Sequence, residues 1–283
     1  MMRALTPAIY DTLFRLVADR IPAPPPHPNG GCRKRIPNEI CFKGIFWRFV
    51  TGAAWETIEA LMDHRVSDTT LRARRTEWVE AGVFDDVMEH ALAEYDRLIG
   101  IDCDQVVIDG SAQLAPGGGD KTGPYPGSKG RLGFKWSCAV DAAGVGIGFV
   151  IDTGGRNDYR LLQPTLDAIC ARPSTATIGT LHLDRGYGYK SLPDRLDGYP
   201  ITHHTVIPRN QPGQGRIPLV GFQQRWIVER TNAWLTNFRQ LKINWDRTTE
   251  HRHAAVNLAF TIICLYKLVD HLTTNDLPLT TIR

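Results

Sequence analysis

The stretch VVIDGS, at residues 106–111, joins a short run of branched apolar residues to an acidic residue and a glycine. Such a run, bounded by turn residues, is typical of a buried β-strand. TLHLDRGYG, at 180–188, repeats the pattern and places Asp184 after a second apolar run. Glu229 lies in RWIVERTNAWL, at 225–235, where apolar residues recur at helical spacing. One acidic residue at the end of each of two strands and one on a helix favours a mixed α/β fold.

The three acidic residues Asp109, Asp184 and Glu229 are of the type that a two-metal phosphodiester site requires. Mg²⁺ prefers oxygen ligands in octahedral geometry and keeps positions open for water and phosphate oxygens. In such sites two ions roughly 3.5 to 4 Å apart activate the attacking hydroxyl and stabilise the leaving oxygen. The predicted cofactor is therefore a pair of Mg²⁺ ions, with Mn²⁺ as a substitute.

Each acidic residue also fits a simpler interpretation. Asp109 before Gly110 is compatible with an ordinary turn in which the carboxylate accepts a hydrogen bond from its own backbone. Asp184 is equally compatible with a turn or a local ion pair. Glu229, four residues after Arg225, fits a solvated helix residue with a salt bridge at helical spacing. The order of the three residues and their flanking sequences favour a shared catalytic role.

Several stretches together resemble the DDE transposases of bacterial insertion sequences, in the insertion-sequence-four superfamily and its insertion-sequence-five branch. The resemblance covers most of residues 35–270 and implies a ribonuclease-H-like catalytic domain, a mixed sheet flanked by helices, with Asp109, Asp184 and Glu229 as its metal ligands. The stretches that carry it are IDGS at 108–111, GRLGFK at 130–135, AVDAAG at 139–144, GGRNDYRLLQPTLDAI at 154–169, LHLDRGY at 181–187, VIPRN at 206–210, RWIVERTNAWL at 225–235 and HRHAAVNLA from 251.

The family also carries a signature around its catalytic Glu, which reads Tyr, two residues, Arg, three residues, Glu, six residues, Lys. Phe222, Arg225 and Glu229 occupy the first three places here, and Thr236 stands at the place of the Lys. The two departures remove a hydroxyl and a cation, so contacts to the terminal phosphate inferred from the signature are in doubt. Two basic residues further along the helix are candidates to replace the lost charge, namely Arg239 and Lys242.

The chain is expected to divide near residue 100 into a helical DNA-binding region, 1–100, and a ribonuclease-H-like catalytic domain, 101–283. Residues 1–20 have a helical pattern, and 21–35 form a Pro/Gly-rich linker. Three further helical segments are predicted at 37–50, 55–63 and 67–82, with Ser67 as the N-cap of the third.

Helices joined by short turns, with basic residues on the last one, are typical of a helix-turn-helix, predicted here over about 37–82. The alternative is a purely structural helical bundle. The residues predicted to contact DNA in this region are Arg72, Arg74 and Arg75.

Beyond residue 104 the pattern changes to strands, predicted at 106–109, 134–140, 147–152 and 178–184, with helices at 161–171, 222–241 and 251–272. The connecting segment 112–133 is rich in Gly and Pro, and it fits either a DNA-contacting loop or a flexible excursion. The basic residues predicted to contact DNA in this half of the chain are Lys121, Lys129, Arg131, Arg225, Arg230, Arg239 and Lys242.

The charge of the 283-residue chain is uneven, although its net value is only +3. Residues 1–75 carry 12 Lys and Arg against 7 Asp and Glu, residues 76–111 carry 1 against 10, and residues 185–283 carry 13 against 7. Two basic segments flanking an acidic one suit a protein that grips phosphate backbone. The acidic segment equally fits the solvated face of a helix.

Other classes of protein fit the sequence less well. The six cysteines form no CxxC pair, so we expect reduced thiols and no zinc ribbon. The Gly run at 117–119 is not followed by the Lys and Ser or Thr of a phosphate-binding loop. The apolar segment 254–269 is shorter than a membrane span and is expected to be a buried core helix. No signal peptide is expected, and the predicted location is the bacterial cytoplasm, in association with the nucleoid.

The resemblance implies a DNA transposase that binds the terminal inverted repeats of its element as double-stranded DNA. It implies metal-dependent strand cleavage, strand transfer into target DNA and self-association on DNA, with no membrane partner. Two alternatives stay open: a non-catalytic or domesticated DNA-binding relative, and a stand-alone ribonuclease-H-like nuclease.

Overall fold

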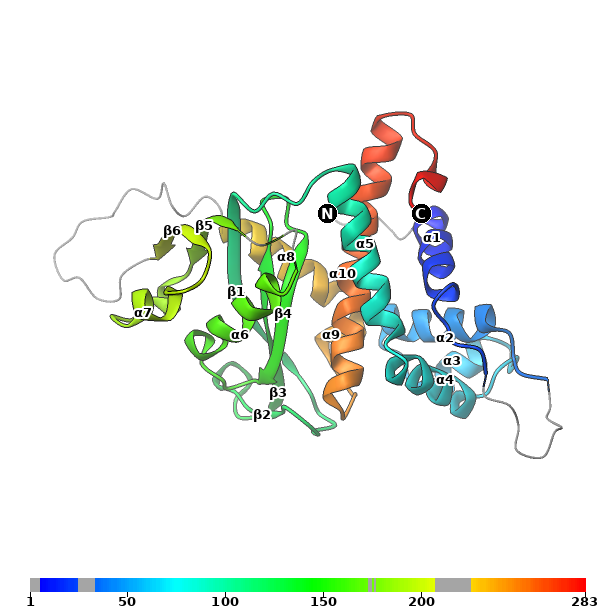
Figure 1. Ribbon diagram of the computed structural model, residues 1–283. Helices are drawn as coiled ribbons and strands as arrows, with labels where there is room; N and C mark the ends of the chain where they lie inside the picture. The colour runs from blue at the N-terminus through cyan, green and yellow to red at the C-terminus, as the bar shows by residue number, and fades with distance from the viewer. Residues whose placement is uncertain (1–5, 25–33, 173–174, 176, 207–224) are drawn as a thin grey trace. The chain divides into compact units, whose positions relative to one another are not determined.

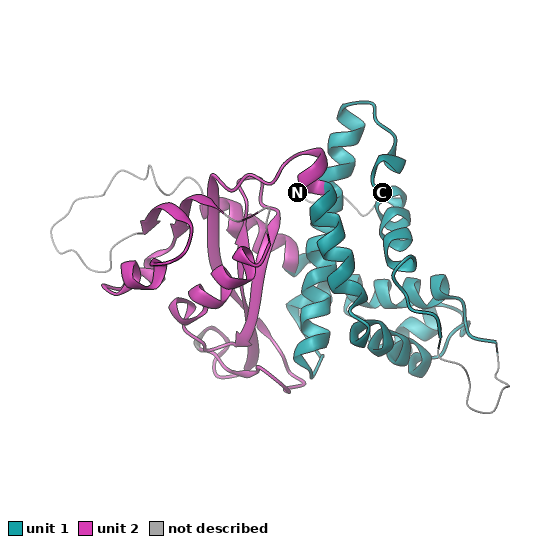
Figure 2. Cartoon of the chain, viewed as in Figure 1, with its two compact units in different colours: residues 1–94, 236–283 teal, residues 95–235 magenta. Residues whose placement is uncertain are grey.

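A computed structural model describes residues 6–24, 34–172, 175, 177–206 and 225–283 (Figure 1). The chain forms two compact units, Met1–Glu94 together with Thr236–Arg283, and Tyr95–Leu235 (Figure 2). The sequence predicted one boundary near residue 100. The first boundary lies close to that position, but the last 48 residues pack with the N-terminal helices rather than with the sheet.

The first unit is built from helices, as the sequence predicted. Its N-terminal helices are α1 (Pro7–Ala18), α2 (Asn38–Thr51), α3 (Trp55–Leu61), α4 (Asp68–Glu80) and most of α5 (Val83–Leu98). The backbone of Gly52 adopts φ 68° where α2 ends, a conformation that glycine adopts without strain. Ser67 caps α4 as predicted, because its hydroxyl accepts a hydrogen bond from the Thr70 N–H at 3.2 Å. Three helices with short connections are thus confirmed, and their reading as a DNA-binding motif stays a prediction.

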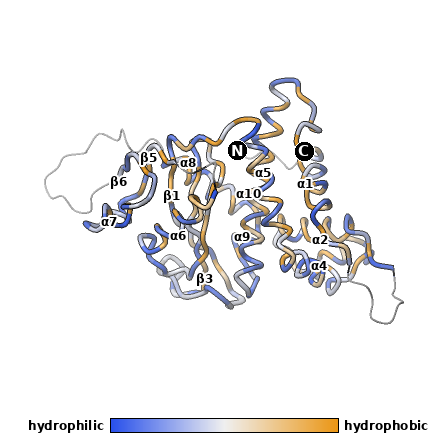
Figure 3. The backbone as a smooth tube through the Cα atoms, viewed as in Figure 1, coloured by the Kyte–Doolittle hydropathy of each residue, from blue (hydrophilic) through white to orange (hydrophobic). Residues whose placement is uncertain are grey.

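The C-terminal part of the first unit comprises α9 (Arg239–Lys242) and α10 (Thr249–Thr274). By length and composition α10 is apolar enough to cross a membrane, but 72% of its most apolar window is buried inside the fold. The expectation of a buried core helix at 254–269 is therefore confirmed. Hydrophobic and hydrophilic residues alternate along the helices of this unit (Figure 3), which is the pattern of helices that pack on one face.

The second unit is organised around one mixed sheet. Its strands are β1 (Gln105–Leu114), β2 (Gly123–Pro124), β3 (Leu132–Val140), β4 (Gly146–Thr153), β5 (Ile178–Leu183) and β6 (Ile201–Val206). β1 pairs antiparallel with β3, and β3 pairs antiparallel with β4. β5 then pairs in parallel with β1, and β6 in parallel with β5. Three antiparallel strands followed by two parallel ones, in the order β4-β3-β1-β5-β6, make a ribonuclease-H-like sheet and confirm the predicted fold class.

Helices cover both faces of this sheet. The unit contains α6 (Asp158–Cys170), α7 (Leu192–Leu196) and most of α8 (Arg225–Asn237). On α6, the Thr165 hydroxyl donates to Ser137 Oγ at 2.8 Å. On α8, Asn232 Oδ1 accepts a hydrogen bond from Trp136 Nε1 at 2.8 Å. Successive residues of a strand point to opposite faces, so α6 and α8 lie on opposite sides of β3.

Candidate active site

Asp109 and Asp184 lie at matching positions on neighbouring parallel strands. The pairing of β1 with β5 joins Gln105 to Thr180 and Val107 to His182, and Asp109 and Asp184 each lie two residues beyond this last pair. Asp184 keeps an extended backbone, with φ −79° and ψ 175°, directly after β5 ends. Because parallel strands lie about 4.8 Å apart and side chains at matching positions share a face, the two carboxylates are neighbours.

The face on which Asp109 lies is fixed by its partner across the antiparallel pair. Asp109 pairs with Cys138 of β3, and directly opposed residues point to the same side of a sheet. The Cys138 thiol donates to Asn232 Oδ1 of α8 at 3.5 Å, so Asp109 points to the side that α8 covers. Glu229 precedes Asn232 by three residues and therefore shares its face of the helix. All three acidic residues thus lie on one side of the sheet.

The third acidic residue is not drawn into the pair. Glu229 has 55% of its side chain exposed, and its carboxylate accepts from Arg225 at 2.8 Å in a salt bridge at helical spacing. In the part of the chain that the structure describes, no three His, Cys, Asp or Glu side chains lie close enough to hold one metal ion. Asp109 and Asp184 therefore lie together, whereas Glu229 forms a local ion pair with Arg225. This ion pair is the alternative that the sequence suggested for Glu229.

The surroundings of Asp109 disfavour its ionised form. The pKa of Asp109 is raised to about 6, chiefly by burial and also by the nearby charge of Asp184, against the opposing effects of the Gly110 N–H and of Arg225. A buried carboxyl beside a second carboxylate disfavours its own ionised form. Since hard divalent cations bind carboxylate oxygens and relieve such repulsion, the donor set of Asp109 and Asp184 fits a divalent metal ion.

Asp184 also makes the local turn that its sequence suggested. Its side chain accepts from the Gly186 N–H and caps the short 3-10 helix Arg185–Tyr187. The Tyr187 side chain is fully buried, and burial raises its pKa well above the usual value, with further contributions from Asp158 and Asp109. The turn and the pairing with Asp109 coexist, because one carboxylate has several acceptor positions.

Two residues beside the pair were not singled out as site residues from the sequence. A Cβ at Gly110 would lie 1.9 Å from Asp158 Oδ1, so the Asp158 carboxylate occupies the space that a side chain would need. Lys135 Nζ donates to the same oxygen at 2.9 Å and to the Arg156 carbonyl at 2.9 Å. Lys135 thereby fastens the start of α6 to the sheet next to Asp109. Their only signal in the sequence was membership of the stretches that resemble the transposase family.

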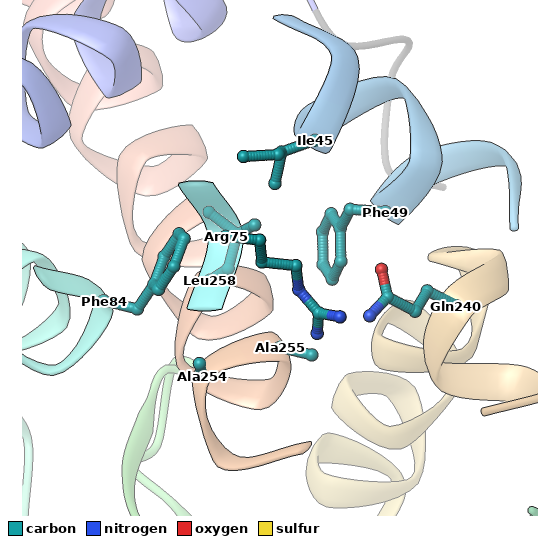
Figure 4. Close-up of a pocket in the computed structure, with 8 residues that line it drawn as sticks. All are labelled: Ile45, Phe49, Arg75, Phe84, Gln240, Ala254, Ala255 and Leu258. Atoms are coloured by element: carbon teal, nitrogen blue, oxygen red, sulfur yellow. The ribbon is translucent and has the colours of Figure 1, made fainter. Parts of the chain in front are cut away.

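Two of the arginines predicted to contact DNA have structural roles. Arg74 donates to Asn38 Oδ1 at 2.7 Å and to the Ile36 carbonyl at 2.7 Å, and Arg75 binds both oxygens of Asp246 at 2.6 and 2.8 Å. Their exposed fractions are only 6% and 7%. Figure 4 shows the Arg75 side chain inside the first unit, among Phe49, Ala255 and Gln240. The prediction that Arg74 and Arg75 contact DNA is therefore corrected, because a phosphate would have to displace buried partners.

Arg72 differs from these two arginines. Its side chain is half exposed and pairs with Glu56 at 2.7 Å and with Asp68 at 3.1 Å. Exposed ion pairs of this kind contribute little and open readily. A DNA contact by Arg72 stays a prediction.

The basic residues of α8 are also engaged. Arg230 donates to the Ala143 carbonyl at 2.7 Å, and its guanidinium lies 4.5 Å from the Trp226 ring and 4.6 Å from the Trp234 ring. Arg230 thus ties α8 to the turn after β3, and a DNA contact is not supported by this arrangement. Trp226 is 53% exposed although it is large and apolar, and its ring lies against the Arg230 guanidinium.

The remaining predicted DNA contacts are exposed and untested. Lys121 and Lys129 lie at exposed turns with φ 50° and 55°, in a segment that partly pairs with β3 through β2. The other exposed basic residues are Arg131, Arg239 and Lys242. Phe222, at the first place of the signature, lies outside the described residues, as does most of VIPRN.

The sheet order and the two carboxylates at its parallel edge define a ribonuclease-H-like protein. Residues 104–266 match the family described as "Transposase DDE domain", and residues 9–88 match the one described as "Putative transposase of IS4/5 family". The first of these covers more than half of the chain. The chain belongs to the DDE transposases, within the IS4/5 family.

Relatives in Burkholderia cepacia agree with this assignment. The putative transposase for insertion sequence element IS402 is 32% identical over 154 residues, which is 52% of this chain and 70% of the relative. The insertion element IS402 uncharacterized 16.2 kDa protein is 33% identical over 122 residues, which is 42% of this chain and 82% of that protein. The structure of a piggyBac transposase synaptic complex with hairpin DNA aligns with a TM-score of 0.48 at 13% identity, covering 97% of this chain and 75% of that one.

Proposed function

We propose that this protein binds the ends of an insertion sequence and catalyses metal-dependent DNA strand cleavage and strand transfer. The observation that carries the proposal is the Asp109–Asp184 pair, in which Asp109 lies within β1 and Asp184 directly follows β5, each two residues beyond the paired residues Val107 and His182. The pair is buried enough to raise the pKa of Asp109 to about 6. Perturbed carboxyl groups of this kind gather at functional sites, and membership of the DDE family supplies the reaction class.

Asp109 and Asp184 would hold the metal ions, and Glu229 would join them from α8. When bound, Mg²⁺ supplies activation of the attacking hydroxyl and stabilisation of the leaving 3′-oxygen. Glu229 must first leave Arg225, and an exposed pair at this spacing contributes only about 0.5 kcal/mol. The small cost makes Glu229 available, and Arg225 is then free to meet a phosphate.

The proton at Asp109 sets the pH range in which the site can act. With a pKa of about 6 in the absence of a cation, Asp109 is largely ionised at pH 7.5 and largely protonated at pH 5. A metal ligand must be deprotonated, so cation binding competes with the proton. Metal-dependent cleavage is therefore expected to decline as the pH falls through about 6.

The partners proposed for this reaction are the element's terminal repeats and a target DNA, both double-stranded, with the protein self-associating on DNA. A non-catalytic DNA-binding relative and a stand-alone nuclease are the competing functions. The paired carboxylates favour an enzyme over the first. Strand transfer of a pre-cleaved end separates a transposase from the second.

The direct test is cleavage of a plasmid that carries the DNA flanking the gene, by wild type and by Asp184→Asn. Asp184→Asn keeps the size of the side chain and removes the charge, so it should bind DNA but not cut it. The matched control is Asp194→Asn, an exposed aspartate on α7. Full Mg²⁺-dependent cleavage by purified Asp184→Asn would leave Asp184 with its turn role alone and would remove the catalytic proposal.

A further inference from the structure

A basic cavity in the first unit has no assigned role. Its volume is about 300 Å³, and it lies between α2, α3 and α4 on one side and the segment that enters α10 on the other. This volume is at the lower end of the range for small-ligand sites. The residues that decide its chemistry are Arg48, Trp55, Arg72, Arg75, Trp245 and Arg247.

The positive charges of the cavity are not balanced by its carboxylates. Arg75 is neutralised by Asp246, and Arg72 pairs with carboxylates outside the lining. Arg48 and Arg247 have no ion-pair partner among the residues that the structure describes. Two cations thus remain to attract an anion into the cavity.

Arg48 is the more informative of the two cations. Only 5% of it is exposed, and its Nε is buried without a hydrogen-bond partner within the described ranges. Its guanidinium lies 4.9 Å from the centre of the Trp55 ring. Burial lowers the pKa of Arg48 to about 10, although attraction to the Asp246 carboxylate opposes this shift. A fold keeps such a charge at the expense of stability unless an anion completes it.

Two further features of the lining suit a nucleic acid. Trp245 is 55% exposed although it is large and apolar, and it stands beside Arg247 in the sequence and in the cavity wall. The Thr248 hydroxyl accepts from the His251 N–H and caps α10, so the positive end of a 26-residue helix dipole also lies at the cavity. Exposed tryptophans provide stacking surfaces for bases.

We propose that this cavity binds a phosphate of the DNA backbone through Arg48 and Arg247, with Trp245 packing against the adjoining sugar or base. The inference rests on the proposed DNA binding but not on the catalytic carboxylates. It assigns the phosphate contact in this region to Arg48 and Arg247, which have no ion-pair partner among the described residues, instead of Arg74 and Arg75, whose buried side chains are held by partners in the first unit.

The test compares DNA binding by Arg247→Ala, Trp245→Ala and Arg48→Met with that of wild type, in EDTA so that no strand is cut. The probe is a 40-base-pair duplex taken from the DNA flanking the gene. Arg247→Ala should weaken binding roughly tenfold, the effect of losing one charge-assisted hydrogen bond. The slope of log affinity against log salt should fall by about 0.9. The matched control is Arg65→Ala, an exposed arginine of the same unit outside the cavity lining.

Thermal unfolding separates binding from a structural role. Arg48→Met keeps the apolar stem of the side chain and removes the charge, so it should melt at the same temperature as wild type or higher while binding DNA less tightly. A lower melting temperature with unchanged DNA affinity would assign Arg48 to the fold and overturn the proposal. If Arg48→Met does not fold, the exposed positions Arg247 and Trp245 still decide the question.

Inorganic phosphate distinguishes the source of the anion. We expect phosphate to stabilise wild type and Arg65→Ala. Arg247→Ala should lose both this stabilisation and its affinity for DNA. Stabilisation without any change in DNA affinity would mean a site for free phosphate and would overturn the proposal. Equal DNA binding by Arg247→Ala, Trp245→Ala and Arg65→Ala would also overturn it. Failure of wild type to bind any DNA would refute the proposed function itself.

Discussion

Asp109 and Asp184 each lie two residues after one member of the same strand pair. Val107 of β1 is paired with His182 of β5, Asp109 follows Val107 by two residues, and Asp184 follows His182 by two residues. The two carboxylates are therefore neighbours because of strand register and not because of a flexible loop. A site built on paired strands is positioned by the backbone hydrogen bonds of the sheet. The chemistry of this pair leads to measurable consequences for stability and metal binding.

Asp109→Asn should stabilise the protein in EDTA at pH 7.5. The pKa of Asp109 is about 6 in the folded chain and 3.8 in an ordinary aspartate. Because the folded pKa is the higher one, the folded state binds the proton more tightly, and stability is lost as the pH rises from about 4 to about 6. The loss corresponds to about 2 to 3 kcal/mol, which Asn avoids.

Urea unfolding at pH 7.5 and at pH 3.5 measures this effect. The difference between Asp109→Asn and wild type should be present at pH 7.5 and small at pH 3.5. Addition of Mg²⁺ should then stabilise wild type and leave Asp109→Asn unchanged. A less stable Asp109→Asn at pH 7.5 would show that the carboxylate contributes to the fold.

Glu229→Gln should abolish cleavage with almost no change in stability. Its ion pair with Arg225 is exposed and worth about 0.5 kcal/mol, so the fold does not depend on it. Cleavage assays measure the loss of activity, and thermal unfolding of the same preparation measures the change in stability. Retained cleavage would remove Glu229 from the site and leave a two-carboxylate centre.

Arg75→Ala should destabilise the first unit far more than Arg72→Ala. Asp246 is buried, and although burial opposes its ionisation, attraction to Arg75 and hydrogen bonds from Arg75 and Gln240 lower its pKa to about 2. Removal of Arg75 leaves a buried charge without its partner, at a cost of about 3 to 5 kcal/mol. Arg72 is exposed, and its loss should cost under about 1 kcal/mol.

The pair also predicts an acid limit for the first unit. Since the folded pKa of Asp246 is below its ordinary value, its contribution is present above about pH 4 and is lost as the pH falls towards 2. Urea unfolding of the two arginine variants at pH 7, followed by an acid titration of wild type, checks the statement. Equal stability of Arg72→Ala and Arg75→Ala would contradict it.

Gly110→Ala should disturb the site through Asp158. The new Cβ would lie 1.9 Å from Asp158 Oδ1, so the carboxylate and its partner Lys135 must move. We expect a loss of roughly 1 to 3 kcal/mol, as for other overpacked positions. Asp158→Ala removes the obstacle, so Gly110→Ala should cost much less in that background. Additive effects in this double-mutant cycle would refute the steric explanation.

Apolar strand segments and helix caps could be predicted from the sequence because their causes are local. The apolar run before Asp109 lies in β1 and Ser67 caps α4, as expected. The predicted end of the strand at Asp109 was wrong, because β1 continues to Leu114 and pairs with β3 over that length. β6 was missed, since its residues ITHHTV alternate polar groups on a half-exposed strand and lack a continuous apolar run.

The roles of the arginines could not be predicted, because their partners are distant in the sequence. Asp246, which neutralises Arg75, lies 171 residues further along the chain. The cluster at Arg72, Arg74 and Arg75 therefore has the composition of a DNA-binding surface, although two of its members are buried. The adjacency of Asp109 and Asp184 likewise depends on a register that only the paired strands reveal.

The first unit is discontinuous, made of Met1–Glu94 and Thr236–Arg283, with the whole sheet inserted between its two parts. During synthesis the residues of the sheet emerge before α10, so the catalytic unit can begin to fold while the helical unit still lacks its central helix. The cavity that contains Arg48 and Arg247 needs both parts and is completed last. A nascent or truncated chain that ends before Thr236 would carry the two aspartates without this cavity, so the proposed DNA contact at the cavity requires synthesis through at least His251.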